Sequence, residues 1–177
     1  MNELIEEAGS EDRKVLVFSF FRENIFKISD MLGTKCYGPI TGSVSPDQRQ
    51  KIIDDFEKAP AGSVLVSQIQ AGGTGLNIQS ASVVIICEPQ VKPSIENQAI
   101  SRAYRMGQTR NVLVYKLLCE DSVDERMLKL LQEKQEQFDA FADESVAARE
   151  SIELDSASFT EIINQEIERI NAKNEQA

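Results

Sequence analysis

One glutamine and two arginines in the stretch QAISRAYRMGQ, residues 98–108, have the types and spacing that suit binding of a polyanion. Gln98, Arg102 and Arg105 fall within about 60° of one another on a helix, because a helix turns by about 100° per residue. Gly107 follows, where glycine favours a helix end. Two planar guanidinium groups fit a group with several anionic oxygens, such as a nucleoside triphosphate. The alternative is a solvated charged face. The rest of the stretch disfavours it, and so does the glycine run upstream, at residues 72–77.

Apolar, β-branched runs predict the strands that carry this stretch. They lie at residues 14–20, 35–42, 62–68, 82–88 and 111–118. Segments with apolar residues at helical spacing separate them, at residues 21–32, 45–58 and 94–106. Strands that are apolar on both faces and alternate with helices predict an α/β fold, a parallel sheet with helices on both faces. Ligands of such sheets bind at the carboxyl ends of the strands, where the glycine run and the approach to Arg102 lie.

The chain changes character after residue 118. Of its 29 acidic and 19 basic side chains, 16 acidic and only 6 basic ones lie in residues 119–177. Helices are expected over 122–141 and 158–170, and the acidic residues 142–157 between them are expected as a linker or a partner-docking segment. Residues 1–118 carry no net charge, which argues against strong autonomous binding of nucleic acid. The charge division therefore predicts two regions with different roles.

The residue content excludes several classes of protein. The chain has no histidine, and its three cysteines, Cys36, Cys87 and Cys119, are far apart. This argues against a disulfide scaffold, against most zinc sites and against catalysis by a histidine triad. No apolar run approaches the roughly 18 residues of a membrane helix, and the polar start is no signal peptide. We expect a soluble protein of a reducing compartment with no membrane partner.

Taken in chain order, five stretches resemble the second RecA-like lobe of the Swi/Snf-type DNA-dependent ATPases, in helicase superfamily two. They are VLVFSFF (15–21), ITGSVSPDQRQKIIDDFE (40–57), VSQIQAGGTGLNIQSASVVIICEP (66–89), QAISRAYRMGQ (98–108) and DSVDERML (121–128). The ordered series is highly specific and runs from about Lys14 to about Leu131. It implies a RecA-like lobe over 14–120, followed by an acidic helical extension over 121–177 that braces the lobe. Residues 1–13 are expected as a frayed lead-in or a short helix.

The resemblance implies that ATP lies between two lobes, with Mg²⁺ bound mainly by the N-terminal lobe and no metal site in this one. Arg102 and Arg105 would act as arginine fingers on the γ-phosphate. Gln98 would orient them or touch the nucleotide, although it could be a structural cap partner. Gly73 and Gly75 would let the backbone approach phosphates closely. The alternative for these glycines is a plain tight turn, and a dinucleotide fingerprint fits worse.

Contacts to the phosphates of double-stranded DNA are also implied by the resemblance, without reading of base sequence. The residues are Ser19, Gly42, Ser43, Gly72, Thr74 and Asn77. The alternative for the serine after Gly42 is that its hydroxyl only satisfies its own turn. Arg110 and Lys92 are expected to be solvated surface.

One stretch departs from the family. EPQVKP (88–93) stands where relatives have an aspartate followed by tryptophan, asparagine and proline, and the chain has no tryptophan. Val91 or Gln90 cannot supply the stacking area of that indole ring.

The sequence contains neither a GxxxxGK[ST] P-loop nor an acidic metal-binding box, so we expect no ATP hydrolysis by this chain alone. The expected function is half of an ATP-dependent double-stranded-DNA translocase or remodeller, as an excised half or beside a partner lobe. It would act in the cytoplasm at the nucleoid of a prokaryote, or in a eukaryotic nucleus. One alternative is a non-catalytic interaction module whose acidic helices bind a protein partner. An RNA helicase is disfavoured by the form of the arginine stretch.

Overall fold

The computed structural model describes residues 1–71, 78–104, 108–119 and 123–141, with side chains up to residue 133 in the last range, and six more residues between 160 and 168. The chain forms two compact units. The first comprises Met1–Glu88 and Ile95–Leu117, and the second comprises Pro89–Ser94 and Leu118–Ala177. Among the described residues, no helix is both long and apolar enough to span a membrane.

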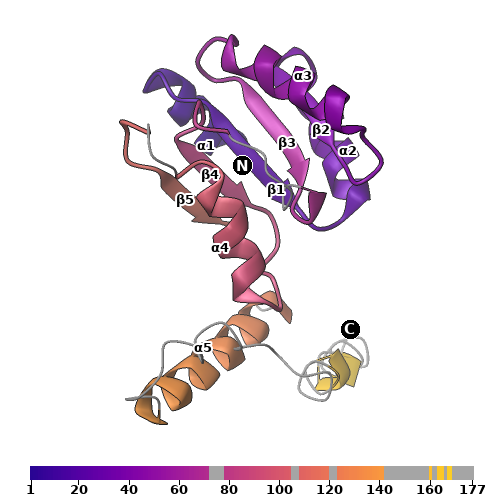
Figure 1. The fold of residues 1–177 in the computed structure, drawn as a ribbon. Helices are drawn as coiled ribbons and strands as arrows, with labels where there is room; N and C mark the ends of the chain where they lie inside the picture. The colour runs from indigo at the N-terminus through magenta and orange to yellow at the C-terminus, as the bar shows by residue number, and fades with distance from the viewer. Residues whose placement is uncertain are drawn as a thin grey trace. The chain divides into compact units, whose positions relative to one another are not determined.

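The first unit is built on a five-stranded sheet in the order β2-β3-β1-β4-β5, with every strand pair parallel (Figure 1). The strands are β1 (Val15–Ser19), β2 (Cys36–Ile40), β3 (Val64–Gln68), β4 (Val83–Ile86) and β5 (Leu113–Lys116). In the central strand, Val15 lies beside Val64 of β3 and Val83 of β4. The predicted α/β fold with a parallel sheet is confirmed.

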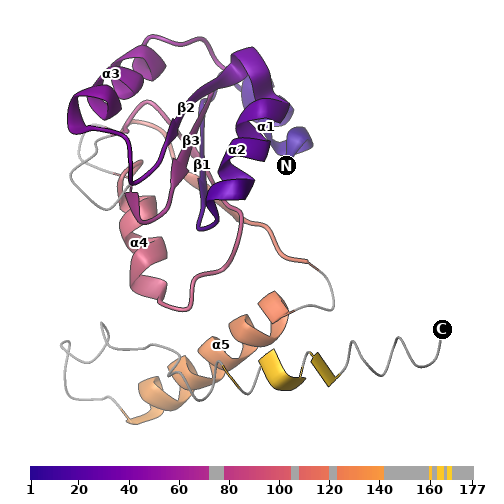
Figure 2. The ribbon, with the colours of Figure 1, turned by 90° about the vertical axis from the view of Figure 1, so that its right-hand side faces the viewer.

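Helices cover both faces of this sheet (Figure 2). They are α1 (Asn2–Ser10), α2 (Arg22–Leu32), α3 (Pro46–Glu57) and α4 (Pro93–Ser101), with a short 3₁₀ turn at Gly33–Lys35. Side chains alternate along β1: Val15 and Val17 pack on the side of α1 and α2, while Leu16 and Phe18 pack on the side of α3 and α4. This is why β1 is fully buried and reads as a continuous apolar run.

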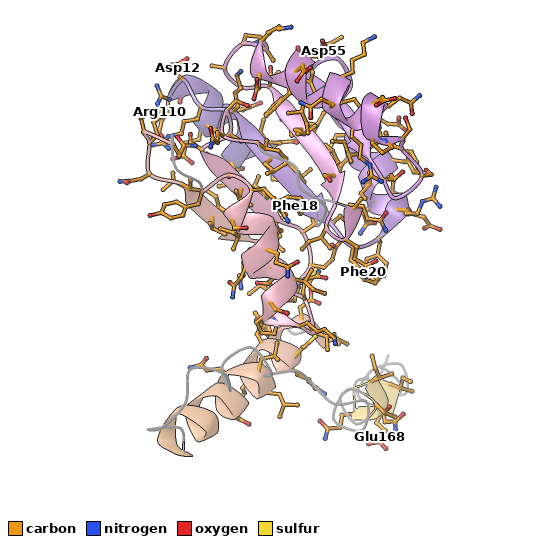
Figure 3. The ribbon with its side chains drawn as sticks, viewed as in Figure 1. Asp12, Phe18, Phe20, Asp55, Arg110 and Glu168 are labelled. Carbon is orange, nitrogen blue, oxygen red and sulfur yellow. The ribbon has the colours of Figure 1, made fainter. Side chains whose placement is uncertain are left out.

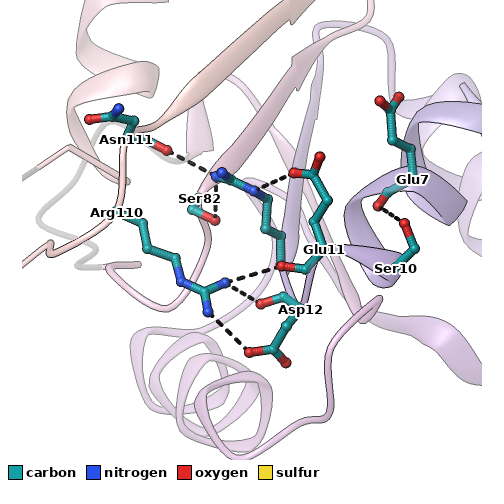
Figure 4. A network of polar contacts seen from close by, with 8 residues as sticks. Glu7, Ser10, Glu11, Asp12, Ser82, Arg110 and Asn111 are labelled. Carbon is teal, nitrogen blue, oxygen red and sulfur yellow. Dashed lines mark hydrogen bonds and ion pairs between the residues drawn. The ribbon is translucent and has the colours of Figure 1, made fainter.

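The N-terminal segment, expected as a frayed lead-in or a short helix, is the helix α1. Ile5 and Ala8 lie on its buried face, each 3% exposed, and pack with the core of the first unit. The Arg110 side chain, expected as solvated surface, is 45% exposed and forms an ion pair with Asp12 at 3.0 Å (Figure 4). Arg13 lies beside this pair and donates to Ser82 Oγ at 3.3 Å. These contacts link the lead-in to the segments that precede β4 and β5.

The start of α3 is a capping box, as Ser45 followed three residues later by Gln48 predicts from the sequence. Ser45 Oγ accepts from the backbone N–H of Gln48, and Gln48 Oε1 accepts from the backbone N–H of Ser45, each at 3.4 Å. At the other end, Lys14 donates to the carbonyls of Phe56 and Glu57 at 3.0 and 2.7 Å. A cation there stabilises the last turn of the helix, although burial lowers the pKa of Lys14.

The second unit contains α5 (Val123–Phe141), close to the predicted helix over 122–141. Met127 and Leu131 are buried and pack with Val91, Val123 and Leu130. Val91, at the centre of the departing stretch, thus belongs to the apolar cluster under α5. The described residues between 160 and 168 are helical, as expected. The linker over 142–157 lies outside the described residues.

Candidate functional site

The helix predicted over 94–106 is shorter than expected, since α4 ends at Ser101. The Ser101 hydroxyl donates to the carbonyl of Gln98 at 2.7 Å. The N–H of Arg102 then donates to Ala99 O, three residues back, instead of extending the helix. Gln98 is exposed whereas Arg102 is only 8% exposed, and their predicted common face stays a prediction.

Arg102 lies in the turn after α4, and its burial argues against the solvated charged face for this arginine. Its carbonyl accepts from the N–H of Ile78 at 3.1 Å. Ile78 directly follows the glycine run. This hydrogen bond therefore connects the residue after the run with the arginine stretch. Arg105 and Gly107 lie outside the described residues.

The Gln108 side chain makes a second connection between the arginine stretch and the segment after the glycine run. Its side-chain amide donates to Gln79 O at 2.9 Å and to Ala81 O at 3.0 Å, and its Oε1 accepts from the N–H of Arg110 at 3.1 Å. One amide therefore joins the segment after the glycine run to the segment after the arginines. Its place at the end of QAISRAYRMGQ was noted from the sequence, but not this role.

The glycine run itself lies outside the described residues, including Gly72, Gly73, Thr74, Gly75 and Asn77. Both residues that flank it are described. Ala71 is 7% exposed and Ile78 is fully buried, and both belong to the core on the side of α3 and α4. The run therefore starts and ends at fixed points of the first unit.

Arg49 of α3 is a functional candidate that the sequence reasoning missed. Its guanidinium donates to Val44 O at 2.8 Å, to Gly42 O at 3.2 Å and to Thr41 O at 3.3 Å. It also reaches Ala71 O at 3.5 Å, directly before the glycine run. One side chain therefore connects the turn after β2 with the start of the run. The sequence signals were its place early in a strongly capped helix and in the Arg-Gln pair of ITGSVSPDQRQKIIDDFE, a stretch that carries the resemblance.

Replacing Arg49 with lysine is expected to destabilise the first unit by about 1–3 kcal/mol, because one ammonium cannot reach carbonyls spread around a planar guanidinium. Urea unfolding measures the change. Lys51→Ala, on an exposed position of the same helix, is the control and should change stability by about 0.5 kcal/mol or less. Equal stability of the Arg49→Lys variant and the wild type would contradict this role.

The three described residues of the proposed DNA surface are already engaged in contacts. The Ser19 hydroxyl is buried and donates to Glu88 Oε1 at 2.8 Å. The N–H of Gly42 donates to Gln68 Oε1 at 3.2 Å. Ser43 is exposed, and its hydroxyl lies 2.9 Å from Thr41 Oγ1, which agrees with the alternative that it satisfies its own turn.

Cys87 directly follows β4, but it offers no reactive thiolate. Burial, with a contribution from the Glu88 charge, raises the pKa of its thiol to about 12. The thiol therefore stays protonated at neutral pH and behaves as a small apolar side chain.

Two cavities of about 500 and 430 Å³ lie away from the carboxyl ends of the strands. Residues before the strands line them, among them Lys14 and Ser82 in the smaller one and Ser63 in the larger. Gln108 of the arginine stretch lines the smaller cavity, but no described residue predicted to contact ATP or DNA lines either one.

The family model described as "Helicase conserved C-terminal domain" matches residues 1–107. The SNF2 domain-containing protein ENL1 of Oryza sativa subsp. japonica is 34% identical over 132 residues, which cover 73% of this chain. An uncharacterized ATP-dependent helicase of Mycoplasma pneumoniae is 35% identical over 136 residues, which cover 76%. The chain spans 13% of the length of each of these relatives.

A solved structure is similar over nearly the whole chain. The C-terminal part of the Fun30 ATPase domain superposes with a TM-score of 0.75 at 26% sequence identity. The superposition covers 95% of this chain and 52% of the other.

Proposed function

Since the chain belongs to the helicase conserved C-terminal domain family, in its Swi/Snf branch, we propose that it is the second RecA-like lobe of an ATP-dependent double-stranded-DNA translocase. The observation that carries the proposal is the bond from Ile78 N–H to the carbonyl of Arg102. This bond joins the residue that follows the glycine run to the arginine stretch, which supports a shared site for the two.

In this proposal ATP and Mg²⁺ are bound mainly by the N-terminal lobe, and this chain supplies the opposite wall. Guanidinium groups suit phosphate oxygens rather than a metal ion. Arg102 and Arg105 would stabilise the charge that develops as the γ-phosphate leaves, and Gln98 would touch the nucleotide. The burial of Arg102 supports a pre-oriented guanidinium, because a group fixed before the reaction costs no reorganisation during it. Gly73 and Gly75 would let the backbone approach the phosphates.

The DNA contacts of the proposal are contacts to phosphate. The loop at Ser19 and the turn at Gly42 and Ser43 follow β1 and β2 at the carboxyl edge of the sheet. Because the Ser19 hydroxyl and the Phe20 N–H already donate to Glu88, this loop would shape the DNA surface, and the exposed Ser43 would contact a phosphate. Gly72, Thr74 and Asn77 would complete the surface. Such contacts position a protein on DNA and carry no sequence preference.

The proposed partners are double-stranded DNA and the N-terminal lobe, with a protein partner on the acidic residues 119–177. The relatives include one from a plant and one from a bacterium. In a eukaryote this chain would act in the nucleus, and in a prokaryote it would act in the cytoplasm at the nucleoid.

A triplex-displacement assay tests translocation directly. The protein that carries both lobes is expected to release a third strand from double-stranded DNA only when ATP is present. Double-stranded RNA of the same sequence is the control and should give no release. ATP hydrolysis without displacement on DNA would contradict a translocase, and displacement from RNA would favour the RNA helicase.

A further inference from the structure

The carboxylate of Glu88 collects hydrogen bonds from the end of the neighbouring strand. Glu88 follows β4, and its Oε1 accepts from Ser19 Oγ at 2.8 Å and from Asn24 Nδ2 at 2.7 Å. Its Oε2 accepts from the N–H of Phe20 at 3.0 Å. The donors come from the end of β1, from the loop after it and from the first turn of α2. One side chain thus fixes the whole path of that loop.

A second side chain fixes the same loop from the other direction. The amide of Gln68, the last residue of β3, donates to Phe20 O at 3.4 Å. Its oxygen accepts from the N–H of Gly42 at 3.2 Å. The peptide groups on both sides of Phe20 are therefore bound, and Gln68 connects this loop with the turn after β2.

The bound loop carries exposed apolar side chains. Phe20 is 41% exposed (Figure 3) and Phe21 is 54% exposed. Their rings meet edge to face with centroids 5.3 Å apart. Rings at the surface contribute little to fixing a backbone, so its conformation depends on the polar contacts to Glu88 and Gln68.

We propose that Glu88 and Gln68 are positioning residues that hold the loop 19–21 and the turn 42–43 as one preformed phosphate-binding edge. The inference rests on the proposed function and identifies what orients its DNA contacts. The residue types fit the role. A carboxylate only accepts, and it serves the donors of Ser19, Phe20 and Asn24 together, whereas an amide accepts and donates and can join Gly42 to Phe20.

The test uses Glu88→Gln in the protein that carries both lobes. A glutamine presents an NH₂ group to the donors of the loop, so at least one bond is lost while the shape is kept. The DNA concentration that gives half-maximal stimulation of ATP turnover is expected to rise roughly tenfold, in line with the loss of a charge-assisted bond. The KM for ATP at saturating DNA should stay within about twofold, because the loop residues that Glu88 binds are not proposed to contact the nucleotide.

Two further variants complete the design. Glu6→Gln makes the same chemical change on an exposed position of α1. It should leave the DNA concentration for half-maximal stimulation unchanged. Gln68→Ala removes the second contact and should raise the same DNA concentration roughly threefold. If Glu88→Gln does not fold, as judged by its thermal unfolding, Gln68→Ala decides the question.

The outcomes are distinct. The inference is supported if the DNA concentration for half-maximal stimulation rises while the KM for ATP stays unchanged. An unchanged DNA concentration for half-maximal stimulation in a folded variant overturns it, and so does a parallel loss of DNA and ATP binding, which would indicate a purely structural role. If DNA does not stimulate the wild type, the proposed function itself fails and the inference fails with it.

Discussion

Arg105→Ala is expected to slow ATP turnover by about 10³–10⁵-fold in the protein that carries both lobes, at saturating DNA and ATP. The arginine is proposed to stabilise charge that appears only in the transition state, and alanine leaves that charge without its guanidinium. Affinity for ATP should therefore change much less than the rate. Single-turnover hydrolysis separates the chemical step from binding and product release.

Arg110→Ala is the matched control for this prediction. It removes an arginine five positions further along the chain, one that pairs with Asp12 at the surface. Turnover should stay within a few-fold of the wild type, since exposed ion pairs contribute little. A rate for Arg105→Ala equal to that of Arg110→Ala, with both variants folded and binding ATP, would exclude the arginine-finger role.

Phe56→Ala should cost about 3–5 kcal/mol of unfolding free energy, a large part of the roughly 5–15 kcal/mol of a typical domain. Phe56 is fully buried on α3, and its ring meets that of Tyr37 edge to face with centroids 5.8 Å apart. Lys14 Nζ lies 5.5 Å from the ring centroid. Alanine would leave a cavity between α3 and the sheet and remove these contacts. Denaturant unfolding measures the loss.

Asp55→Ala is the control for that substitution. Asp55 is the neighbouring residue on α3 and is exposed, so alanine should change stability by about 0.5 kcal/mol or less (Figure 3). A loss below about 1 kcal/mol for Phe56→Ala would mean that α3 is not anchored through this ring.

The sheet could be predicted because its information is local. VLVF, the first four residues of β1, and VVII of β4 are apolar at every position, as is typical of strands buried on both faces. The start of α3 was equally readable, because Ser45, Pro46 and Gln48 signal a capped helix within four residues. The order of the strands in the sheet came from no local signal and was left open.

The candidate site was less predictable because its contacts span the chain. Glu88 meets Ser19 across 69 residues and Asn24 across 64, and no spacing rule connects such pairs. Periodicity overestimated α4, because it could not show that the Ser101 hydroxyl takes the carbonyl of Gln98 and ends the helix. The resemblance pointed to the arginines and to the turn after β2. It gave no role to Arg49 and Gln68, the side chains that bind this turn.

The most direct test of the split ATP site is complementation. A fixed amount of the cognate N-terminal lobe is titrated with this chain, and phosphate release is measured with and without double-stranded DNA. We predict no turnover by either lobe alone and DNA-stimulated turnover that rises and saturates as the chain is added. Undiminished hydrolysis by the N-terminal lobe alone, unchanged by this chain, would contradict the claim that this lobe completes the catalytic site.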